Sequence, residues 1–190
     1  MSTAAAIYLA TAVVPFKKRL MMLMFFAIVF LAVYLDQITK WLAIIFLKGE
    51  ESANVINNVL RFTYVENRGA AFGMFSDHRW VFLLVSSVAI IGITVYMIKW
   101  RPESKLACTA ISFIVGGGIG NMIDRLCIGY VVDFIDFYAF PNLWKFIFNV
   151  AESFVCVGAG LLMFYLISSM IKEAKQEKLN ATENKAADAE

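Results

Sequence analysis

The sequence predicts an all-α membrane protein, a four-transmembrane-helix bundle with a small extracytoplasmic β-like segment and an interfacial amphipathic segment. Of its 190 residues, 61% are hydrophobic and 17% are charged, whereas soluble domains have about 45–50% apolar and about 25% charged residues. The mean hydropathy of +0.71 agrees. Four long apolar blocks contain a single charged residue, Glu152, and cover residues 20–35, 80–98, 106–123 and 146–171.

The lengths of these blocks match what a bilayer requires. A transmembrane helix needs about 20 apolar residues, with a range of about 17–25. The second and third blocks fit directly, the first fits if residues 38–41 extend it, and the fourth is long enough to tilt or overhang. The apolar stretch at 4–14 is short and precedes the basic residues at 17–19, an order that differs from a signal peptide. We therefore expect an N-terminal stub with a basic cytoplasmic flank at 1–19 and a four-span domain at 20–171.

Basic residues predict the orientation of the spans. They cluster at 17–19, 99–105 and 172–178, and four spans place all three clusters on one side of the membrane. Because Lys and Arg near span ends favour the cytoplasm, both termini should be cytoplasmic. The charged segment 172–190 cannot bury a core, so we expect a disordered cytoplasmic tail.

The two segments between spans on the outer side have different patterns. Residues 59–65 are rich in strand-forming side chains and precede the turn signal Asn67-Arg68-Gly69, which predicts a small extracytoplasmic sheet. In the other segment, residues 130–137 place Asp133 among apolar neighbours close to the membrane surface. A solvated loop does not explain that carboxylate.

Composition excludes several classes of function. A net charge of +2 without a basic stripe argues against nucleic-acid binding. Cys108, Cys127 and Cys156 are odd in number and lack CxxC spacing, so they predict neither a disulfide framework nor a zinc site. The single histidine, His78, which we place in an interfacial loop, cannot build a His-based metal centre. Carboxylates, amides and basic groups must supply the chemistry, and we expect no cofactor.

Polar residues in the spans are the candidates for that chemistry. A carboxylate at the centre of a membrane helix costs about 2.5–3.5 kcal/mol, and Glu152 follows Asn149 by three residues, which puts both on one helical face. The alternative is that Glu152 pairs with a basic group at the outer interface. Gly116 and Gly120 have the spacing of close helix packing.

Acidic residues near the outer side suggest two further arrangements. Asn121 and Asp124 extend the glycine face of the third span outward. Asp36 and Lys40 have the spacing of an intrahelical ion pair, which we favour over a catalytic role. If Asp133 and Glu152 meet at the outer mouth of the bundle, they would share one proton and could activate water, as aspartic peptidases do.

Five blocks, in order within a match that runs from about residue 35 to about residue 160, resemble the motifs of lipoprotein signal peptidase, or signal peptidase II. The blocks are Asp36-Gln-Ile-Thr-Lys40, Asn67-Arg-Gly-Ala-Ala-Phe-Gly73, Gly116-Gly-Gly-Ile-Gly-Asn-Met-Ile-Asp-Arg125, Gly129-Tyr-Val-Val-Asp-Phe134 and Phe148-Asn-Val-Ala-Glu-Ser153. Because the match as a whole covers all four spans and both outer segments, and contains so many linked blocks, the resemblance is far more specific than a lone motif.

The resemblance implies a bacterial inner-membrane aspartic endopeptidase that cleaves diacylglyceryl-modified prolipoproteins before the lipidated cysteine, with its active site near the outer face. Its catalytic aspartates correspond to Asp133 and to the position of Glu152, where the family pattern has Asp. The partners implied are lipidated prolipoproteins and membrane lipids, for a monomer without metal or cofactor. The remaining matched positions are substrate-lining at Asn67, Gly69, Asn121, Arg125 and Asn149, supporting at Asp124, and stabilising at Asp36 and Lys40.

Glu152 leaves several hypotheses open. Its extra methylene moves the carboxylate, and misplacement of about 1 Å can cost on the order of 10²-fold in rate. The chain could be an active enzyme with a compensating backbone, a weakened variant, or a non-cleaving paralogue that binds lipidated peptides. A proton-coupled transporter component, with Asp124 and Glu152 as a relay, is a further alternative, but the inner halves of the spans are almost purely apolar.

Overall fold

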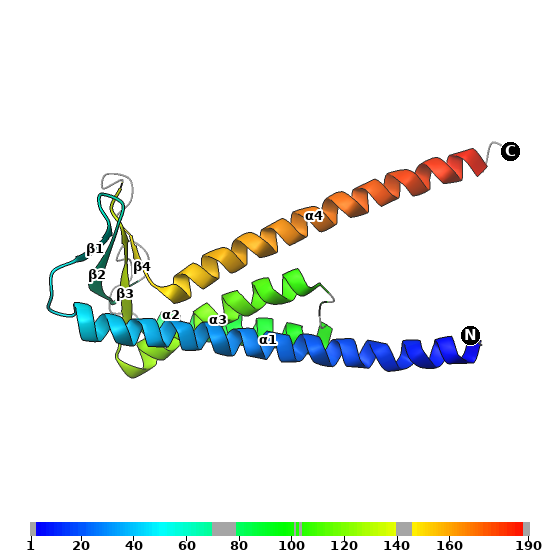
Figure 1. The fold of residues 1–190 in the computed structure, drawn as a ribbon. Helices are drawn as coiled ribbons and strands as arrows, with labels where there is room; N and C mark the ends of the chain where they lie inside the picture. Colours follow the sequence, from blue (N-terminus) through cyan, green and yellow to red (C-terminus); the bar gives the residue numbers. More distant parts are fainter. Residues whose placement is uncertain (1–2, 70–78, 101, 103, 140–145, 188–190) are drawn as a thin grey trace.

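A computed structural model describes the chain at residues 3–69, 79–100, 102, 104–139 and 146–187. Figure 1 shows long helices with a small sheet at one end, and both termini lie at the opposite end. The elements in chain order are α1 (Thr3–Leu47), β1 (Ala53–Ile56), β2 (Leu60–Asn67), α2 (Arg79–Trp100), α3 (Lys105–Cys127), β3 (Val131–Phe137), β4 (Ile147–Phe148) and α4 (Val150–Ala187).

In the part of the chain that the structure describes, four helices are long and apolar enough to cross a membrane, which confirms the predicted four-span architecture. The candidate spans are Lys18–Leu47, Trp80–Trp100, Lys105–Cys127 and Val150–Thr182. The start of the fourth span differs from the prediction, because residues 146–148 precede α4 and two of them form β4. A short apolar run reads alike in a buried strand and in a helix, so hydropathy alone could not separate these residues from the span.

The sheet is antiparallel throughout, in the order β1-β2-β3-β4. Its β2 strand contains most of the segment whose composition predicts strand. Strands β3 and β4 come from the second outer segment. For this segment the sequence analysis predicted no strand, only that Asp133 lies close to the membrane surface. The register pairs Val65 with Asp133 and Asn67 with Val131, so the sheet places Asp133 beside the end of β2.

Helix α3 is the centre of the bundle and packs against the other three helices. Its glycines permit this: a Cβ at Gly116 would meet Ala32 of α1, and one at Gly117 would meet the carbonyl oxygen of Ala151 in α4. The close packing predicted from the glycine spacing is therefore confirmed. Without a hydrophobic driving force in lipid, such backbone approach supplies much of the packing between membrane helices.

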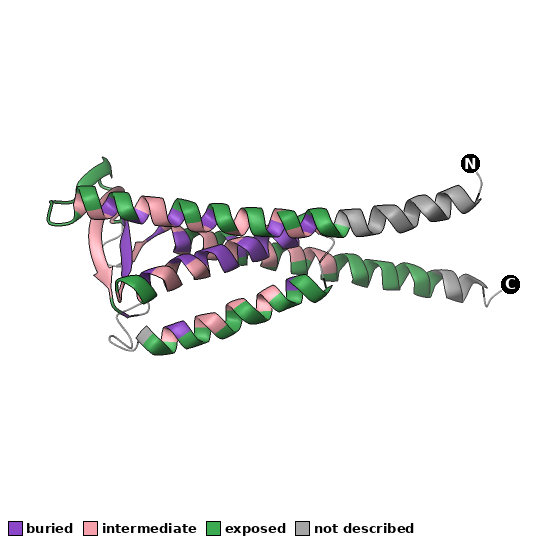
Figure 2. Cartoon of the chain, turned by 90° about the horizontal axis from the view of Figure 1, so that it is seen from below, coloured by how far each residue is buried: buried purple, intermediate pink, exposed green. Residues whose placement is uncertain are grey.

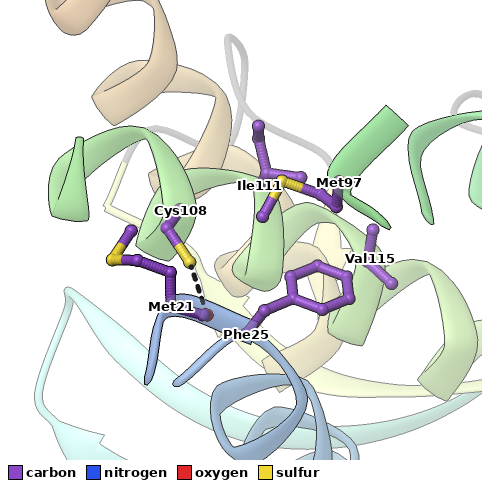
Figure 3. Packing of buried hydrophobic residues seen from close by; sticks show 6 residues of the cluster. All are labelled: Met21, Phe25, Met97, Cys108, Ile111 and Val115. Atoms are coloured by element: carbon purple, nitrogen blue, oxygen red, sulfur yellow. Dashed lines mark hydrogen bonds between the residues drawn. The ribbon is translucent and has the colours of Figure 1, made fainter. Parts of the chain in front are cut away.

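Two buried apolar clusters hold the bundle and the sheet. Figure 3 shows the first cluster, in which the Cys108 thiol donates to the carbonyl oxygen of Met21 at 3.6 Å. The second cluster packs the end of α1 on the sheet through Ala43, Val132 and Phe134. The members of the first cluster are Met21, Phe25, Met97, Cys108, Ile111 and Val115.

Exposed apolar side chains cover the outside of the helices, as expected for a surface that faces lipid. Phe30, Leu84 and Phe164 are more than half exposed, and Figure 2 shows buried residues concentrated on α1, α3 and strand β3. Beyond the bundle, α4 continues as a helix to Ala187, and its side chains are exposed as far as Thr182. This differs from the disordered tail that we expected, because its Ala, Glu, Lys and Gln residues are also strong helix formers. Helix α1 likewise runs from Thr3 without a break between the expected stub and the first span.

Candidate active site

Asp133 lies at the centre of the site, in β3, with 2% of its surface exposed. Two amides hold its carboxylate. The Asn67 Nδ2 donates to Asp133 Oδ2 at 2.8 Å, and the Asn149 Nδ2 donates to Oδ1 at 2.6 Å. Because Asn67 ends β2 and Asn149 follows β4, the sheet brings together two amides that are far apart in the sequence. A carboxylate oxygen has two lone pairs, so each oxygen can still bind a proton or water.

Asn149 caps helix α4, and Glu152 lies in its first turn. The backbone N–H of Glu152 donates to Asn149 Oδ1 at 2.8 Å, which is the hydrogen bond of an N-cap. The expectation that both residues share a helical face is therefore wrong, because Asn149 precedes the helix. The N-terminal end of a helix favours a carboxylate, which lowers the cost of an acid at this depth.

A cavity of about 470 Å³ opens beside this helix start. Glu152 lines it, and among the described residues its carboxylate makes no hydrogen bond or ion pair. Asp133 acts electrostatically on Glu152, and Asn149 bonds to both residues. Glu152 therefore lines the cavity as an uncommitted acid, meaning that its carboxylate has no hydrogen-bond or ion-pair partner among the described residues. The neighbouring acid, Asp133, has both carboxylate oxygens hydrogen-bonded. The cavity is lined by Asn67, Asn121, Phe146, Ile147, Phe148, Glu152, Val155 and Cys156.

Burial changes the acidity of Asp133. It raises the pKa of this carboxyl from the ordinary value of 3.8 to about 6, although hydrogen bonds from Asn67 and Asn149 and the charges of Lys40 and Arg125 oppose the change. A group with a pKa near 6 is populated in both protonation states close to neutral pH. Asp133 can therefore accept or hold a proton during a reaction.

A buried ion cluster lies behind the acids. The Lys40 Nζ is 2.9 Å from Asp36 Oδ2 and 2.9 Å from Asp124 Oδ2, which confirms the ion pair predicted within α1 and adds an acid from α3. The same nitrogen donates to Asn121 Oδ1 at 2.8 Å. Gln37, which the sequence analysis missed, donates to Asp124 Oδ1 at 2.9 Å. Only its position beside Asp36 in the first motif could have indicated it.

Backbone groups complete this cluster. The N–H of Ala151 in α4 donates to Asp36 Oδ1 at 2.8 Å, and the N–H of Val132 in β3 donates to Asp124 Oδ2 at 3.1 Å. No side-chain pattern reveals these partners. The cluster therefore ties α1, α3, α4 and β3 together, and it satisfies the hydrogen bonds that buried charges require.

Arg125 joins the turn after β2 to the bundle. Its guanidinium donates to the carbonyl oxygens of Gly69 and Asn121, both at 3.4 Å, and stacks over Phe82 of α2 with 5.1 Å between Cζ and the ring centre. The Gly69 N–H donates to Asn67 Oδ1 at 3.0 Å, so the predicted turn is present. The structure thus brings all the predicted site residues into one connected region. Residues 70–73 of the second motif and His78 lie outside the described residues.

The site offers carboxylates and amides but no group of three or more His, Cys, Asp or Glu placed to hold a metal ion among the described residues. Where two acids do converge, at Asp36 and Asp124, the Lys40 ammonium occupies the cation's position. The chemistry that the arrangement supports is proton transfer that involves two acids, Glu152 on the wall of the cavity and the buried Asp133, whose charge acts on it.

Comparison with known proteins places the chain among membrane peptidases. The family model described as signal peptidase (SPase) II matches residues 28–168. The lipoprotein signal peptidase of Halalkalibacterium halodurans is 39% identical over 82% of this chain and 99% of its own length. That of Caldanaerobacter subterraneus is 47% identical over 74% and 93%. Two solved structures, each described as a bacterial membrane enzyme, have TM-scores of 0.69 and 0.68 at 31% and 33% identity, and cover 77% and 75% of this chain and 89% and 92% of theirs.

Proposed function

Because the chain belongs to the signal peptidase II family, we propose that it is an aspartic-type endopeptidase that removes the signal peptide from diacylglyceryl-modified prolipoproteins. Cleavage falls immediately before the lipidated cysteine. Asp133 and Glu152 are the two catalytic acids. The observation that carries this assignment is their placement: a buried carboxyl with a raised pKa lies next to an uncommitted carboxyl that lines a cavity.

The reaction needs one proton shared by the two acids. The ionised acid removes a proton from a water molecule, whose oxygen attacks the scissile carbonyl carbon while the protonated acid donates to the carbonyl oxygen. The tetrahedral intermediate collapses when the carbon–nitrogen bond breaks and the leaving amine takes a proton. One water is consumed, and the products are a new carboxyl terminus and a new amino terminus at the cysteine. Titration belongs to the pair rather than to either residue.

The cavity wall suits a peptide with apolar side chains. Phe146, Val155 and Cys156 supply an apolar side, and the amides of Asn67 and Asn121 supply polar groups that can bind a peptide backbone. Gly69, which Arg125 holds through its carbonyl oxygen, forms the turn beside Asn67. These contacts support the proposed substrate-binding roles of Asn67, Gly69, Asn121, Arg125 and Asn149, with Asp124 as a supporting acid.

The proposed location is the bacterial inner membrane, with both termini in the cytoplasm and the active site near the outer face. Two observations support it. The termini share one end of the molecule and the sheet with its acids lies at the other (Figure 1), and the three basic clusters lie near the span ends on the side of the termini. We propose a monomer, with lipidated prolipoproteins and membrane lipids as its partners.

The transporter alternative has less support. The buried charged residues Asp36, Lys40 and Asp124 lie at the sheet end, whereas the cluster around Phe25 and Val115 is apolar. A proton path through the membrane needs polar groups along its whole depth. Among the described residues, buried charged groups occur at the sheet end only, and the buried polar residue of the apolar part is Ser112, whose hydroxyl donates to the carbonyl oxygen of Cys108.

Cleavage by purified protein tests the proposal. The chain, reconstituted in lipid nanodiscs, is incubated with a diacylglyceryl-modified prolipoprotein and with the same precursor lacking the lipid. We expect a shortened product from the lipidated precursor alone, with a mass that places the cut before the modified cysteine. If the lipidated precursor binds but stays intact with the wild-type protein, the non-cleaving paralogue is the correct reading.

A further inference from the structure

Lys40 donates to an amide as well as to two carboxylates. Its ammonium carries three N–H groups, and its Nζ has three acceptors: Asp36 Oδ2 and Asp124 Oδ2, each at 2.9 Å, and Asn121 Oδ1 at 2.8 Å. The side chain is 3% exposed. Every donor of this buried cation is therefore satisfied, and one of them points to a neutral group next to the acids of the site.

This contact determines how two amides are oriented. An ammonium group can only donate, so Asn121 must turn its Oδ1 toward Lys40. The same oxygen accepts a hydrogen bond from Asn149 Nδ2 at 3.1 Å. Asn149 therefore points its NH₂ group to Asn121 and to Asp133 Oδ1, the latter at 2.6 Å, while the helix N–H of Glu152 holds its oxygen at the other end.

We propose that Lys40 is a positioning residue for the acid pair, which acts through Asn121 and Asn149 to keep an amide donor directed at Asp133. This inference rests on the proposed function, because it assigns Lys40 a role only if Asp133 is a catalytic acid. Lys40 is not among the residues that line the cavity. Its hydrogen bonds reach Asp133 only through the two amides.

Ion pairing alone does not account for the contact with Asn121. Asp36 and Asp124 each have a backbone N–H and Gln37 as further donors, so the cluster is stabilised independently of that amide. An asparagine freed from Lys40 can rotate its amide and present NH₂ to the NH₂ of Asn149. Two donors then face each other, and the donor held against Asp133 is displaced.

Loss of the oriented amide donor should change the pKa of Asp133 in a predictable direction. A hydrogen bond to the ionised form lowers the pKa of a carboxyl, so its loss raises the pKa of Asp133. The charged groups around Asp133 are Lys40 from α1, Arg125 from α3 and Glu152 from α4. Asp124 of α3 also lies close, because it accepts a hydrogen bond from the N–H of Val132, the residue before Asp133. From β2, the group in contact with Asp133 is the neutral amide of Asn67. A test must therefore separate orientation from the charge of Lys40.

Three variants make that separation. Asn121→Leu breaks the link and leaves Lys40 and its two carboxylates in place. Lys40→Gln combined with Asp124→Asn removes the donor-only group together with one negative charge, so the net charge of the cluster is unchanged. Asp124→Asn alone is the matched control, because it changes the charge but leaves Lys40 directed at Asn121.

Infrared titration of the carboxyl band in lipid nanodiscs measures Asp133 without requiring cleavage, and Asp133→Asn identifies its band. We expect Asn121→Leu and the Lys40→Gln/Asp124→Asn pair to raise the midpoint by about 0.7 pH unit, a fivefold change in proton affinity typical of one hydrogen bond. Asp124→Asn alone should lower it. In the cleavage assay the Lys40→Gln/Asp124→Asn protein should lose kcat about fivefold, in proportion to the same hydrogen bond, with a KM close to that of wild type. Asn121→Leu should lose kcat by a similar factor and also raise KM, because Asn121 lines the cavity.

The proposal is wrong if Asn121→Leu shifts the midpoint and the folded Lys40→Gln/Asp124→Asn protein titrates as wild type does. Should that double variant not fold, Lys40→Arg decides the matter, because a guanidinium also only donates. We then expect the wild-type midpoint, and a shift as large as that of Asn121→Leu overturns the proposal. Failure of the proposed function is distinct: the wild-type protein would not cleave, whatever the midpoints show.

Discussion

The buried cluster around Lys40 and the acid pair at the cavity contain the same residue types in opposite states. In the cluster, Asp36 and Asp124 have all their oxygens bonded to an ammonium, an amide or a backbone N–H. In the pair, Asp133 is hydrogen-bonded to two neutral amides and forms no ion pair, and the Glu152 carboxylate makes no hydrogen bond or ion pair among the described residues. Acids paired with a buried cation hold the helices together, whereas acids without an ion-pair partner remain able to exchange protons.

The largest effect that tests this difference should follow from Asp133→Asn. The substitution removes the proton-exchanging group, and loss of general acid–base catalysis typically costs about 10²–10⁴-fold in rate. Its cost to stability should be small, because one of the two amide hydrogen bonds is lost while a buried charge is also removed. Cleavage rates and melting curves in nanodiscs check both parts. Near-wild-type turnover would show that Asp133 takes no part in the chemistry.

Lys40→Met should affect stability more than the chemical step, in contrast to Asp133→Asn. It leaves two buried carboxylates without a cation, and breaking a buried ion pair costs about 3–5 kcal/mol. We expect a large loss of folded protein on expression and a strongly lowered melting temperature. A variant as stable as wild type would contradict the structural role of the cluster.

Gly120→Ala should destabilise the cluster less severely. A Cβ at this position would meet the Asp36 carboxylate, and the overpacking of a tight contact costs about 1–3 kcal/mol. Gly92→Ala is the matched control, because nothing lies within 4 Å of a Cβ there. Thermal unfolding of the two proteins should show a loss for Gly120→Ala only. Equal melting temperatures would mean that α1 and α3 can separate without cost.

The smallest expected effect is the pH dependence of stability that Asp133 contributes. Its pKa rises on folding, from 3.8 to about 6, so the folded state binds the proton more tightly than the unfolded state. The stability from the neutral carboxyl is therefore complete below pH 3.8 and is lost as the pH rises through about 6. Melting temperatures of wild type and Asp133→Asn, measured between pH 4 and pH 7, should diverge in this sense. Parallel curves would contradict the raised pKa.

The two regions also differ in how far the sequence predicts them. The Asp36–Lys40 pair and the glycine packing of α3 follow from spacing along one helix, a local property, and the structure confirms both. Strands β3 and β4 were missed, because their apolar residues are buried and lack the alternation that indicates a half-exposed strand. The N-cap role of Asn149 was hidden for a related reason: apolar residues both precede and follow it, so hydropathy does not mark the start of the helix there.

Partners supplied by the tertiary fold could not be predicted at all. The backbone N–H groups of Ala151 and Val132 carry no side-chain signal, yet they satisfy Asp36 and Asp124. The amide of Asn67 reaches Asp133 because β2 and β3 are neighbours in the sheet. Sequence motifs indicated which residues belong to the site, and only the strand register shows which of them touch.

Cleavage rates of the wild-type protein, Glu152→Asp and Glu152→Gln on one lipidated prolipoprotein test the central claim, that the uncommitted Glu152 is the second catalytic acid. We expect Glu152→Gln to be inactive and Glu152→Asp to retain a carboxylate and therefore activity. A rate above wild type for Glu152→Asp, by up to about 10²-fold for a correction of about 1 Å, would identify a weakened enzyme, and a lower rate one adjusted to glutamate. Wild-type turnover by Glu152→Gln would contradict the account.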